Sequence, residues 1–255
     1  MNPIKNERVN EENYNKFGSM MIIINYRSAK DIDVYFPEYD WVYKNTRYEK
    51  FKKGSLKCPY EPRNYGVGYI GEGRHKSSYN NVHSKIYDVW NHMLQRCYSA
   101  ISNYKYPTYE NCYVCDEWLN FQNFADWYER NYYEINDEQM NLDKDILYKG
   151  NNIYSPETCI IVPHSINSLF IKSDAVRGEL PIGVNYDGRY KTYNAHCNDH
   201  GDLIWLGSYK TPEEAFNVYK LYKEDLIKRI AEEYKEVIPS VLYDAMNNYV
   251  VEIDD

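Results

Sequence analysis

The feature that most constrains the fold is a run of alternating polar and apolar residues that ends in a helix start. Residues 183–227 read GVNYDGRYKTYNAHCNDHGDLIWLGSYKTPEEAFNVYKLYKEDLI. Alternation with a period of two is typical of strands with one buried and one exposed face, so this segment predicts two or three short strands. Thr211 can then cap a helix, with Pro212 at its first position and Glu214 completing a capping box.

The residues before this segment predict a β-rich unit followed by helices. Residues 17–60 carry MMIIINY and DIDVYF, two runs of β-branched and aromatic residues separated by the polar turn RSAK. Residues 62–78 contain four glycines and little periodicity, which indicates a loop or linker. Helical spacing follows in residues 82–98, and Asp116 can cap a second helix that has one aromatic face.

These patterns together predict an α+β protein built from several small parts. We expect a β-rich N-terminal domain at 1–61, a linker at 62–79, a central helical domain at 80–175 and a C-terminal domain at 176–255. A chain of 255 residues can hold two or three small cores. The C-terminal domain should contain these two or three strands and the helix that follows them, with a further helix at the end of the chain.

Composition indicates a folded protein rather than a disordered tail. Apolar residues make up 43% of the chain and aromatic residues 16%, with 30 tyrosines. No apolar run approaches the roughly 20 residues that span a bilayer, and the start of the chain, MNPIKNERVNEEN, is polar rather than signal-like. We therefore expect a soluble, intracellular protein that does not engage a membrane.

Residues 142–167, LDKDILYKGNNIYSPETCIIVPHSIN, place a carboxylate, a loop and a helix-borne amide in an order that suits one metal ion. Their spacing resembles the ββα-metal motif of HNH nucleases, particularly the homing endonucleases of phage introns. The preceding segments Trp90–Cys97 and Val114–Trp118 match the W-x-x-M-x-x-R-C and V-C-x-E-W order of such phage proteins. By this resemblance Asp143 and Asn167 fall on the two metal-binding positions, and the implied ion is Mg²⁺ or Mn²⁺.

The chain departs from this family at the general base. Lys144 stands where the family has a histidine, and Thr158 where it has an orienting asparagine. Phosphodiester hydrolysis needs a cation to neutralise charge and a base to activate water, and a lysine with an ordinary pKa of about 10.4 is a poor base. We expect Lys144 to contact phosphate instead. His164 is either the substitute base or a solvent-exposed residue at the helix start, and Asp145 is an alternative metal ligand to Asp143.

The six cysteines, in a chain without a secretory signal, indicate reduced thiols or metal binding rather than disulfides. Cys112 and Cys115 form C-Y-V-C, with Cys97 before them and Cys159 after them. Four thiolates around Zn²⁺ would hold the central region together, as structural zinc does in some HNH proteins. The alternative is that these cysteines are unlinked and packed as small apolar residues.

The C-terminal segment resembles the Apetala-type DNA-binding domain of plant ethylene-response factors, which also occurs in phage homing endonucleases. The matching pieces are Gly183-Val184, the Tyr193–Cys197 strand, Trp205–Tyr209 and the T-x-E-E-A-F helix start. In that domain a three-stranded sheet lies in the major groove of DNA and the helix packs behind it. Together with the nuclease-like motif, the resemblance covers roughly residues 80–235.

Alternation along the second predicted strand separates a helix-facing side from a candidate DNA-reading side. Tyr193, Ala195 and Cys197 share the helix-facing side. Asparagine can read adenine, and Arg189 can pair with guanine or phosphate. By the resemblance, Asn185 and Trp205 also fall on contact positions. The remaining candidates alternate onto the reading side: Thr192, Asn194, His196 and Asn198. A polar outer face is also ordinary for a small sheet, and the family usually places more arginines there.

The net charge of −8 argues against a protein that simply coats DNA, because phosphate binding is driven by Lys and Arg displacing counterions. Lys and Arg outnumber Asp and Glu only in residues 1–80, by 14 to 10. Within that region Lys52 and Lys53 lie in the densest basic run. They are either phosphate contacts or part of a solvated loop.

Two functions follow from these patterns. The first is a phage-type protein that binds double-stranded DNA in the cytoplasm of a bacterial host, resembles HNH homing endonucleases, and cleaves or nicks DNA with a divalent metal ion. The second is a catalytically degenerate scaffold whose acidic, tyrosine-rich surface inhibits a host protein, for instance a defence component. The retained Asp143 and Asn167 favour the nuclease, whereas the missing base and the negative net charge favour the inhibitor.

Overall fold

The computed structural model describes residues 8–171 and 178–253, which form two compact units. The first unit comprises residues 1–130 and 152–155, and the second comprises residues 131–151 and 156–255. Helices and several small sheets occur in the chain, which confirms the α+β class. No helix in the described part of the chain is long and apolar enough to cross a bilayer.

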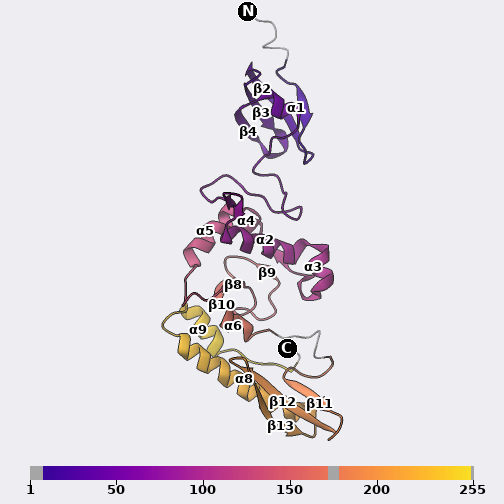
Figure 1. The fold of residues 1–255 in the computed structure, drawn as a ribbon, viewed down its shortest axis with the longest axis vertical. Helices are drawn as coiled ribbons and strands as arrows, with labels where there is room; N and C mark the ends of the chain where they lie inside the picture. The colour runs from indigo at the N-terminus through magenta and orange to yellow at the C-terminus, as the bar shows by residue number, and fades with distance from the viewer. Residues whose placement is uncertain (1–7, 172–177, 254–255) are drawn as a thin grey trace, which may run out of the picture. The chain divides into compact units, whose positions relative to one another are not determined.

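The first unit begins with a four-stranded antiparallel sheet in the order β1–β2–β3–β4 (Figure 1). Its strands are β1 (Glu12–Tyr14), β2 (Met20–Ser28), β3 (Asp31–Phe36) and β4 (Trp41–Thr46), with the short 3₁₀ turn η2 (Pro37–Tyr39) between β3 and β4. Helix α1 (Tyr48–Lys52) follows, and its Phe51 is fully buried. The predicted β-rich unit is confirmed. Its core consists of Met21, Ile23, Ile32, Val34, Phe36, Phe51, Leu56 and Cys58.

The helical part of the first unit is built around buried aromatic rings. Its helices are α2 (Lys85–Tyr98), α3 (Ala100–Lys105), α4 (Asp116–Leu119) and α5 (Phe121–Asn131), with a 3₁₀ turn η3 (Pro107–Tyr109). Two short pairs accompany them: the hairpin β5 (Ser78–Tyr79) with β6 (Val82–His83), and the parallel pair β7 (Tyr113–Val114) with β9 (Ile153–Tyr154). Trp90 and Trp118 are fully buried, and the Trp90 indole donates a hydrogen bond to the Trp118 carbonyl (2.7 Å).

The single helix expected from Asp116 onward is wrong, because Asn120 divides it into α4 and α5. Asn120 has extended backbone angles (φ −85°, ψ 116°), and its side-chain oxygen accepts a hydrogen bond from the Gln122 amide. An asparagine side chain that bonds the nearby backbone competes with helix formation and starts a new helix. The predicted cap is also displaced by one residue, since Cys115 precedes the helix and Asp116 is its first residue.

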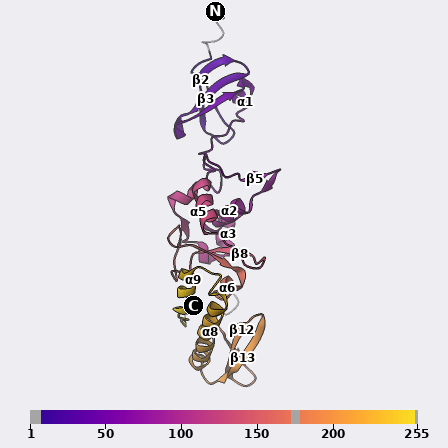
Figure 2. The ribbon, with the colours of Figure 1, turned by 90° about the vertical axis from the view of Figure 1, so that its left-hand side faces the viewer.

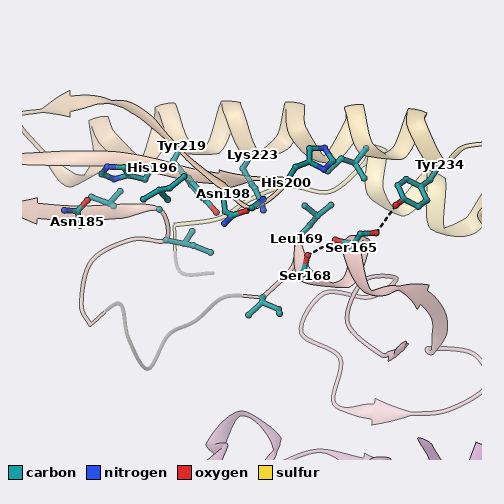
Figure 3. Close-up of a pocket in the computed structure, with 17 residues that line it drawn as sticks. Ser165, Ser168, Leu169, Asn185, His196, Asn198, His200, Tyr219, Lys223 and Tyr234 are labelled. Atoms are coloured by element: carbon teal, nitrogen blue, oxygen red, sulfur yellow. Dashed lines mark hydrogen bonds between the residues drawn. The ribbon is translucent and has the colours of Figure 1, made fainter. Parts of the chain in front are cut away.

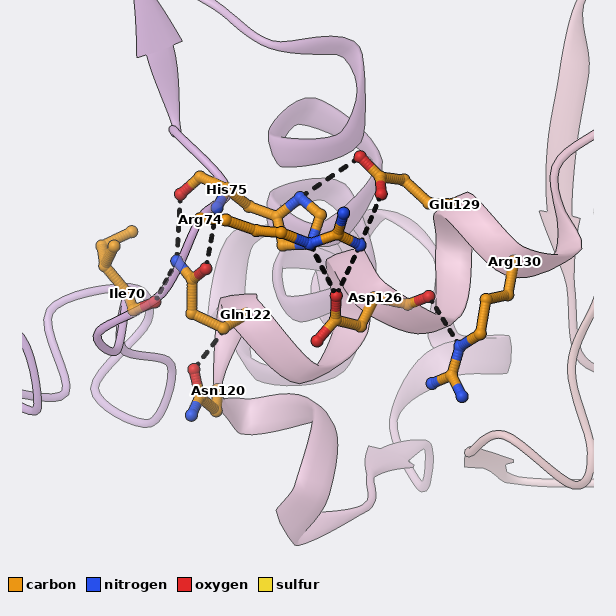
Figure 4. Close-up of polar contacts among 8 residues, drawn as sticks. All are labelled: Ile70, Arg74, His75, Asn120, Gln122, Asp126, Glu129 and Arg130. Atoms are coloured by element: carbon orange, nitrogen blue, oxygen red, sulfur yellow. Dashed lines mark hydrogen bonds and ion pairs between the residues drawn. The ribbon is translucent and has the colours of Figure 1, made fainter.

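The glycine-rich segment expected as a linker is fastened to α5 (Figure 4). The Gln122 amide donates to the carbonyls of Ile70 (3.2 Å) and His75 (3.0 Å), and its oxygen accepts from the His75 amide (3.0 Å). The His75 imidazole is 7% exposed and lies 2.9 Å from the Asp126 carboxylate. Arg74 pairs with both Asp126 and Glu129. Side-chain contacts therefore order this segment despite its glycines.

The second unit contains two strands and a short helix in the order that the sequence predicted. Strand β8 (Met140–Asp143) pairs antiparallel with β10 (Ile160–Pro163), and α6 (His164–Ser168) follows β10 directly. The register places Asp143 opposite Ile160 and Met140 opposite Pro163. Glu138 accepts a hydrogen bond from the Ser165 amide (2.6 Å), which anchors the start of α6 beside the start of β8.

The rest of the second unit is the expected three-stranded sheet on a helix (Figures 1 and 2). Strands β11 (Val184–Asp187), β12 (Thr192–Asp199) and β13 (Asp202–Tyr209) form an antiparallel sheet in that order. Helix α8 (Pro212–Tyr234) starts with the predicted capping box between Thr211 and Glu214, and α9 (Ser240–Asn247) follows it. The helix packs on the face of the sheet that carries Ala195 and Cys197, which are buried.

The strands, the short helix and the sheet of the second unit share one hydrophobic core. Ile160, Val162 and Ile166 of β10 and α6 belong to the same cluster as Ala195 of β12 and Leu226 of α8. The boundary expected between residues 175 and 176 lies outside the described residues, and the described residues on both sides of it belong to one compact unit.

Candidate nucleic-acid interface and metal site

The outer face of the three-stranded sheet collects most of the residues expected to read DNA. Opposed residues of an antiparallel pair project from the same face. Asn185 of β11 lies opposite Asn194 of β12, which lies opposite Ser208 of β13. His196 lies opposite Trp205. The register therefore places the predicted residues of three strands on one surface. This surface, called the outer face below, consists of Asn185, Thr192, Asn194, His196, Asn198, Leu203, Trp205 and Ser208.

Several side chains of the outer face have no hydrogen-bond partner within the described residues. Asn185 is exposed, His196 is half-buried and Trp205 is 63% exposed, and none of the three side chains makes a hydrogen bond to the described part of the chain. Asn194 and Asn198 differ, because their side-chain oxygens accept from Ser208 and from the Gly201 amide. The outer face therefore offers amide, imidazole and indole groups that the fold itself does not use.

The charge at the edge of the outer face comes from the turn between β11 and β12. Arg189 is exposed in this turn, and its backbone amide donates to the Asp187 carboxylate (2.9 Å). The same carboxylate oxygen accepts from the Tyr190 amide (3.4 Å). Asp187 thus shapes the turn, while the guanidinium of Arg189 has no ion pair with any described residue. The Arg189 guanidinium is consequently available for a ligand.

Asp143 lies at the end of β8 and stabilises the turn that follows. Its Oδ1 accepts hydrogen bonds from the amides of Asp145 and Ile146, both at 2.7 Å. Burial raises the pKa of the Asp143 carboxyl, and the two amide donors oppose that rise. A divalent cation would relieve the cost of keeping this carboxylate ionised in a poorly solvated place.

Lys144 is built into the fold rather than presented to a ligand. Its side chain is 7% exposed, and its ammonium donates to both carboxylate oxygens of Asp145 (2.8 and 2.9 Å) and to the Asn151 carbonyl (2.6 Å). The Asn151 amide in turn donates to the Lys144 carbonyl (2.8 Å). These reciprocal contacts close the loop after β8 and also engage Asp145, the alternative metal ligand.

His164 and Asn167 lie on the same short helix but in different surroundings. His164 is exposed at the start of α6, and its Nδ1 lies 3.1 Å from the Asn141 amide nitrogen. Asn141 lies two residues before Asp143 on β8, about 7 Å along the strand. Asn167, one turn further along, is half-buried, and its side chain makes no hydrogen bond to the described residues. Asn167 is therefore the residue of α6 whose side chain is available for a ligand.

The two lysines of the N-terminal region both have carboxylate partners. Lys52 lies 3.3 Å from Glu11, and Lys53 lies 2.6 Å from Glu49. Both lysines are more than half exposed, and exposed ion pairs contribute only about 0–1 kcal/mol. Either lysine can exchange its partner for a phosphate at little cost, so their role as phosphate contacts stays a prediction.

The cysteines expected to bind zinc are divided between the two units. Cys97, Cys112 and Cys115 belong to the first unit, and Cys159 belongs to the second. All four are buried or half-buried, none forms a disulfide, and the Cys112 thiol lies 3.8 Å from the Thr108 carbonyl. Within the described ranges, no three His, Cys, Asp or Glu side chains gather as a metal site. Zinc binding by these cysteines stays a prediction.

Sequence reasoning missed a cavity of about 1120 Å³ in the second unit (Figure 3). It is lined by residues of α6, β11, β12 and α8, among them Lys223. The signal in the sequence was a lysine within the apolar stripe of α8, four residues after Tyr219 and seven before Ile230.

Comparison of the chain with protein-family models, with curated proteins and with solved structures found no match.

Proposed function

We propose that the outer face of the three-stranded sheet binds double-stranded DNA. The observation that carries this proposal is the group of exposed or half-exposed polar side chains that the fold leaves without partners, namely Asn185, His196 and Trp205. Polar groups that already hydrogen-bond within a protein must lose those bonds before they bind a base. These three would lose only their contacts with water.

The chemistry of the outer face suits contact with base edges. The major groove admits a small sheet, and an asparagine can donate to and accept from adenine at once. Asn185 and His196 supply donors and acceptors, and Trp205 supplies a flat apolar surface for a thymine methyl group or the sugar backbone. Arg189, at the edge of the sheet, is placed for guanine or phosphate.

The charge of the chain sets the expected character of this binding. A face with one arginine and several amides neutralises few phosphates, so the affinity should depend weakly on salt. Most of the affinity would then come from base contacts, and sequence preference should be marked. Non-specific binding should be weak at physiological ionic strength.

A binding titration against a randomised duplex pool, followed by the preferred sequence at two salt concentrations, tests the proposal. Asn185→Ala and Arg189→Ala should each lose about 1–3 kcal/mol at the preferred sequence, the value of one good base contact. Lys228→Ala is the matched control, since Lys228 is exposed on α8, which covers the opposite face of the sheet. If wild-type protein binds no duplex at low salt, the proposal fails and inhibition of a host protein becomes the leading alternative.

A second candidate function is metal-dependent cleavage of that DNA. The favouring observation is that β8, β10 and α6 follow one another as strand, strand and helix, with the carboxylate of Asp143 on the first strand and the uncommitted amide of Asn167 on the helix. Carboxylate and amide oxygens suit Mg²⁺, which keeps several of its waters. In this proposal Asp143 and Asn167 would hold the ion, which would neutralise charge on the phosphate and help to activate water, and Lys144 would hold the loop in place.

Nicking of supercoiled plasmid with Mg²⁺ or Mn²⁺ tests the nuclease. Asp143→Ala should abolish nicking and Asn167→Ala should reduce it strongly, because each removes a metal ligand. His164→Ala separates the roles of α6, since a base at His164 predicts a large loss and an exposed helix-start residue predicts none. Wild-type protein that cleaves no DNA with either ion contradicts the nuclease without touching the binding proposal.

A further inference from the structure

The cavity of the second unit exists because β11 is shorter than its neighbour. β11 pairs with Thr192–Ala195 of β12, whereas β12 continues to Asp199. The His196 amide donates to the Gly183 carbonyl (2.8 Å), and no strand pairs with β12 beyond that point on this side within the described residues. The cavity occupies the place that a longer β11 would fill, with α8 and α6 as its other walls (Figure 3).

Lys223 is the charged residue that α8 contributes to this cavity. It lies one turn after Tyr219, among the residues of the helix that face the core. Its ammonium makes no hydrogen bond or ion pair with any described residue, and burial lowers the pKa of its side chain. The carboxylate of Asp199, two residues after Cys197, is already engaged by the Tyr222 hydroxyl (2.8 Å) and by Arg229 (3.1 Å).

An ammonium without a hydrogen-bond or ion-pair partner in a half-buried position is unfavourable, because part of its hydration is lost and the nearby charge of Asp199 offsets that loss only in part. An apolar residue at this position of α8 would pack without that cost. A lysine at position 223 is therefore favourable when an anion from outside the chain pairs with its ammonium. Charge-assisted hydrogen bonds of this kind are stronger than neutral ones.

The described lining of the cavity has a consistent chemical character. It contains Lys223, two imidazoles and several hydroxyl and amide groups, and it contains no carboxylate, although the chain has 38 Asp and Glu among 255 residues. Leu169, Ile182 and Val184 form an apolar side. Pockets for small molecules combine apolar walls with a few converging polar groups and enclose about 300–1,000 Å³. A space of about 1120 Å³ exceeds the needs of a single inorganic ion.

We propose that this cavity binds a small organic anion, with its phosphate or carboxylate group at Lys223 and its apolar body against Leu169, Ile182 and Val184. The cavity wall also offers the polar side chains of Asn198 and His200 (Figure 3). The cavity shares Asn185, His196, Asn198 and Leu203 with the outer face, but its charged contact, Lys223, lies on α8, and anion binding is tested without DNA. Its ligand class follows from the charge and shape of the wall alone.

Titration calorimetry with phenyl phosphate and with phenylacetate tests the proposal and distinguishes the two anionic groups. Phenol and inorganic phosphate serve as controls that carry only the apolar body or only the charge. Wild-type protein should bind at least one organic anion more tightly than either control. Lys223→Met should weaken that binding about tenfold or more, which corresponds to roughly 1.4 kcal/mol. Lys223→Arg, which keeps the charge, should retain most of it.

Two further measurements keep the test decisive. Lys228→Met changes an exposed lysine of the same helix and should leave binding unchanged. In unmodified protein, the amide resonances of Gly183 and Gly201, which both line the cavity, should shift on adding the anion. This second readout holds even if Lys223→Met does not fold. The proposal is overturned if wild-type protein binds neither organic anion, if Lys223→Met binds as well as wild type, or if the shifts map elsewhere.

Discussion

The two candidate sites of the second unit use their polar side chains in opposite ways. Around β8, the groups that sequence reasoning assigned to chemistry are mostly engaged within the fold: Asp143 accepts two backbone amides, and Lys144 bonds Asp145 and Asn151. On the outer face of the sheet, comparable groups are largely unused. Residues of similar chemistry thus differ in how many hydrogen bonds they make within the fold.

The difference shows why a motif match is weaker evidence than a side chain's surroundings. A carboxylate and a lysine in tandem read as a metal ligand and a phosphate contact, yet the same pair also closes a loop. The outer face carries the stronger functional argument, because its amide and imidazole groups contribute little to the fold. Substitutions can separate these two kinds of residue by their effect on the free energy of unfolding.

The largest loss in the free energy of unfolding should come from Gly183→Ala, which disturbs the packing of the sheet against α8. Gly183 has a positive φ of 76°, and a Cβ at this position would lie 2.1 Å from the ring of Tyr219. Left-handed strain and overpacking together should cost about 2–4 kcal/mol, measured by urea unfolding. Gly188→Ala is the control, since its Cβ would meet no atom closer than 3.9 Å. Equal stability of the two variants would show that the sheet is not held in this position.

Lys144→Met should give the next largest loss in the free energy of unfolding. It tests whether the loop after β8 depends on the Lys144 ammonium. The substitution removes the contacts to Asp145 and the hydrogen bond to the half-buried Asn151 carbonyl, so we expect a loss of about 1–3 kcal/mol in urea unfolding. Lys210→Met, at an exposed position, should change little. If the Lys144→Met variant is as stable as wild type, the Lys144 side chain contributes little to the fold and is available to bind a ligand.

Asp199→Asn should have a smaller, pH-dependent effect. Hydrogen bonds from Tyr222 and Arg229 lower the pKa of the Asp199 carboxyl. A lowered folded-state pKa contributes stability above the ordinary carboxyl pKa of about 3.9, and this stability is lost as pH falls through the folded-state value. Asp199→Asn should therefore cost about 1 kcal/mol at neutral pH and less in acid.

Thermal unfolding of wild type and Asp199→Asn across this pH range measures the difference. Asp202→Asn, on the exposed start of β13, is the control for a carboxyl outside this network. A gap between wild type and Asp199→Asn that stays constant into acid would show that Asp199 contributes by packing instead of charge.

The smallest effect on stability should come from the outer face itself. Asn185→Ala and His196→Ala remove side chains that bond no described residue, so each should change the free energy of unfolding by less than about 0.5 kcal/mol. A loss of more than 1 kcal/mol in either variant, measured by the same urea unfolding, would place these residues among those that carry the fold.

Local patterns predicted much of the fold of the second unit. The alternation in residues 192–198 and the capping residues Thr211 and Glu214 act within a few positions of the chain, so the strands and the start of α8 could be read directly. The attachment of residues 70–75 to α5 could not, because it depends on Gln122 and Asp126, some 50 positions away.

The candidate site shows the same division. Placement of Asn194 and His196 on one face followed from strand periodicity, whereas the burial of Lys144 depended on a loop that closes through Asn151. The cavity around Lys223 escaped prediction for a related reason. It arises from a difference in length between two strands and from the approach of α6, neither of which any short window of sequence records.

The shared core of the second unit also limits where the chain can be truncated and which parts of it can be exchanged between proteins. Ile160, Val162 and Ile166 are covered by the same cluster that covers Ala195 and Leu226. A chain truncated before β11 would expose these apolar side chains to water. A sheet transplanted without β10 and α6 would lose part of the apolar surface on which it packs. The outer face is consequently not a part that can be exchanged on its own. A chimera that tests the proposed DNA binding would have to exchange side chains on the outer face and leave the backbone junctions intact.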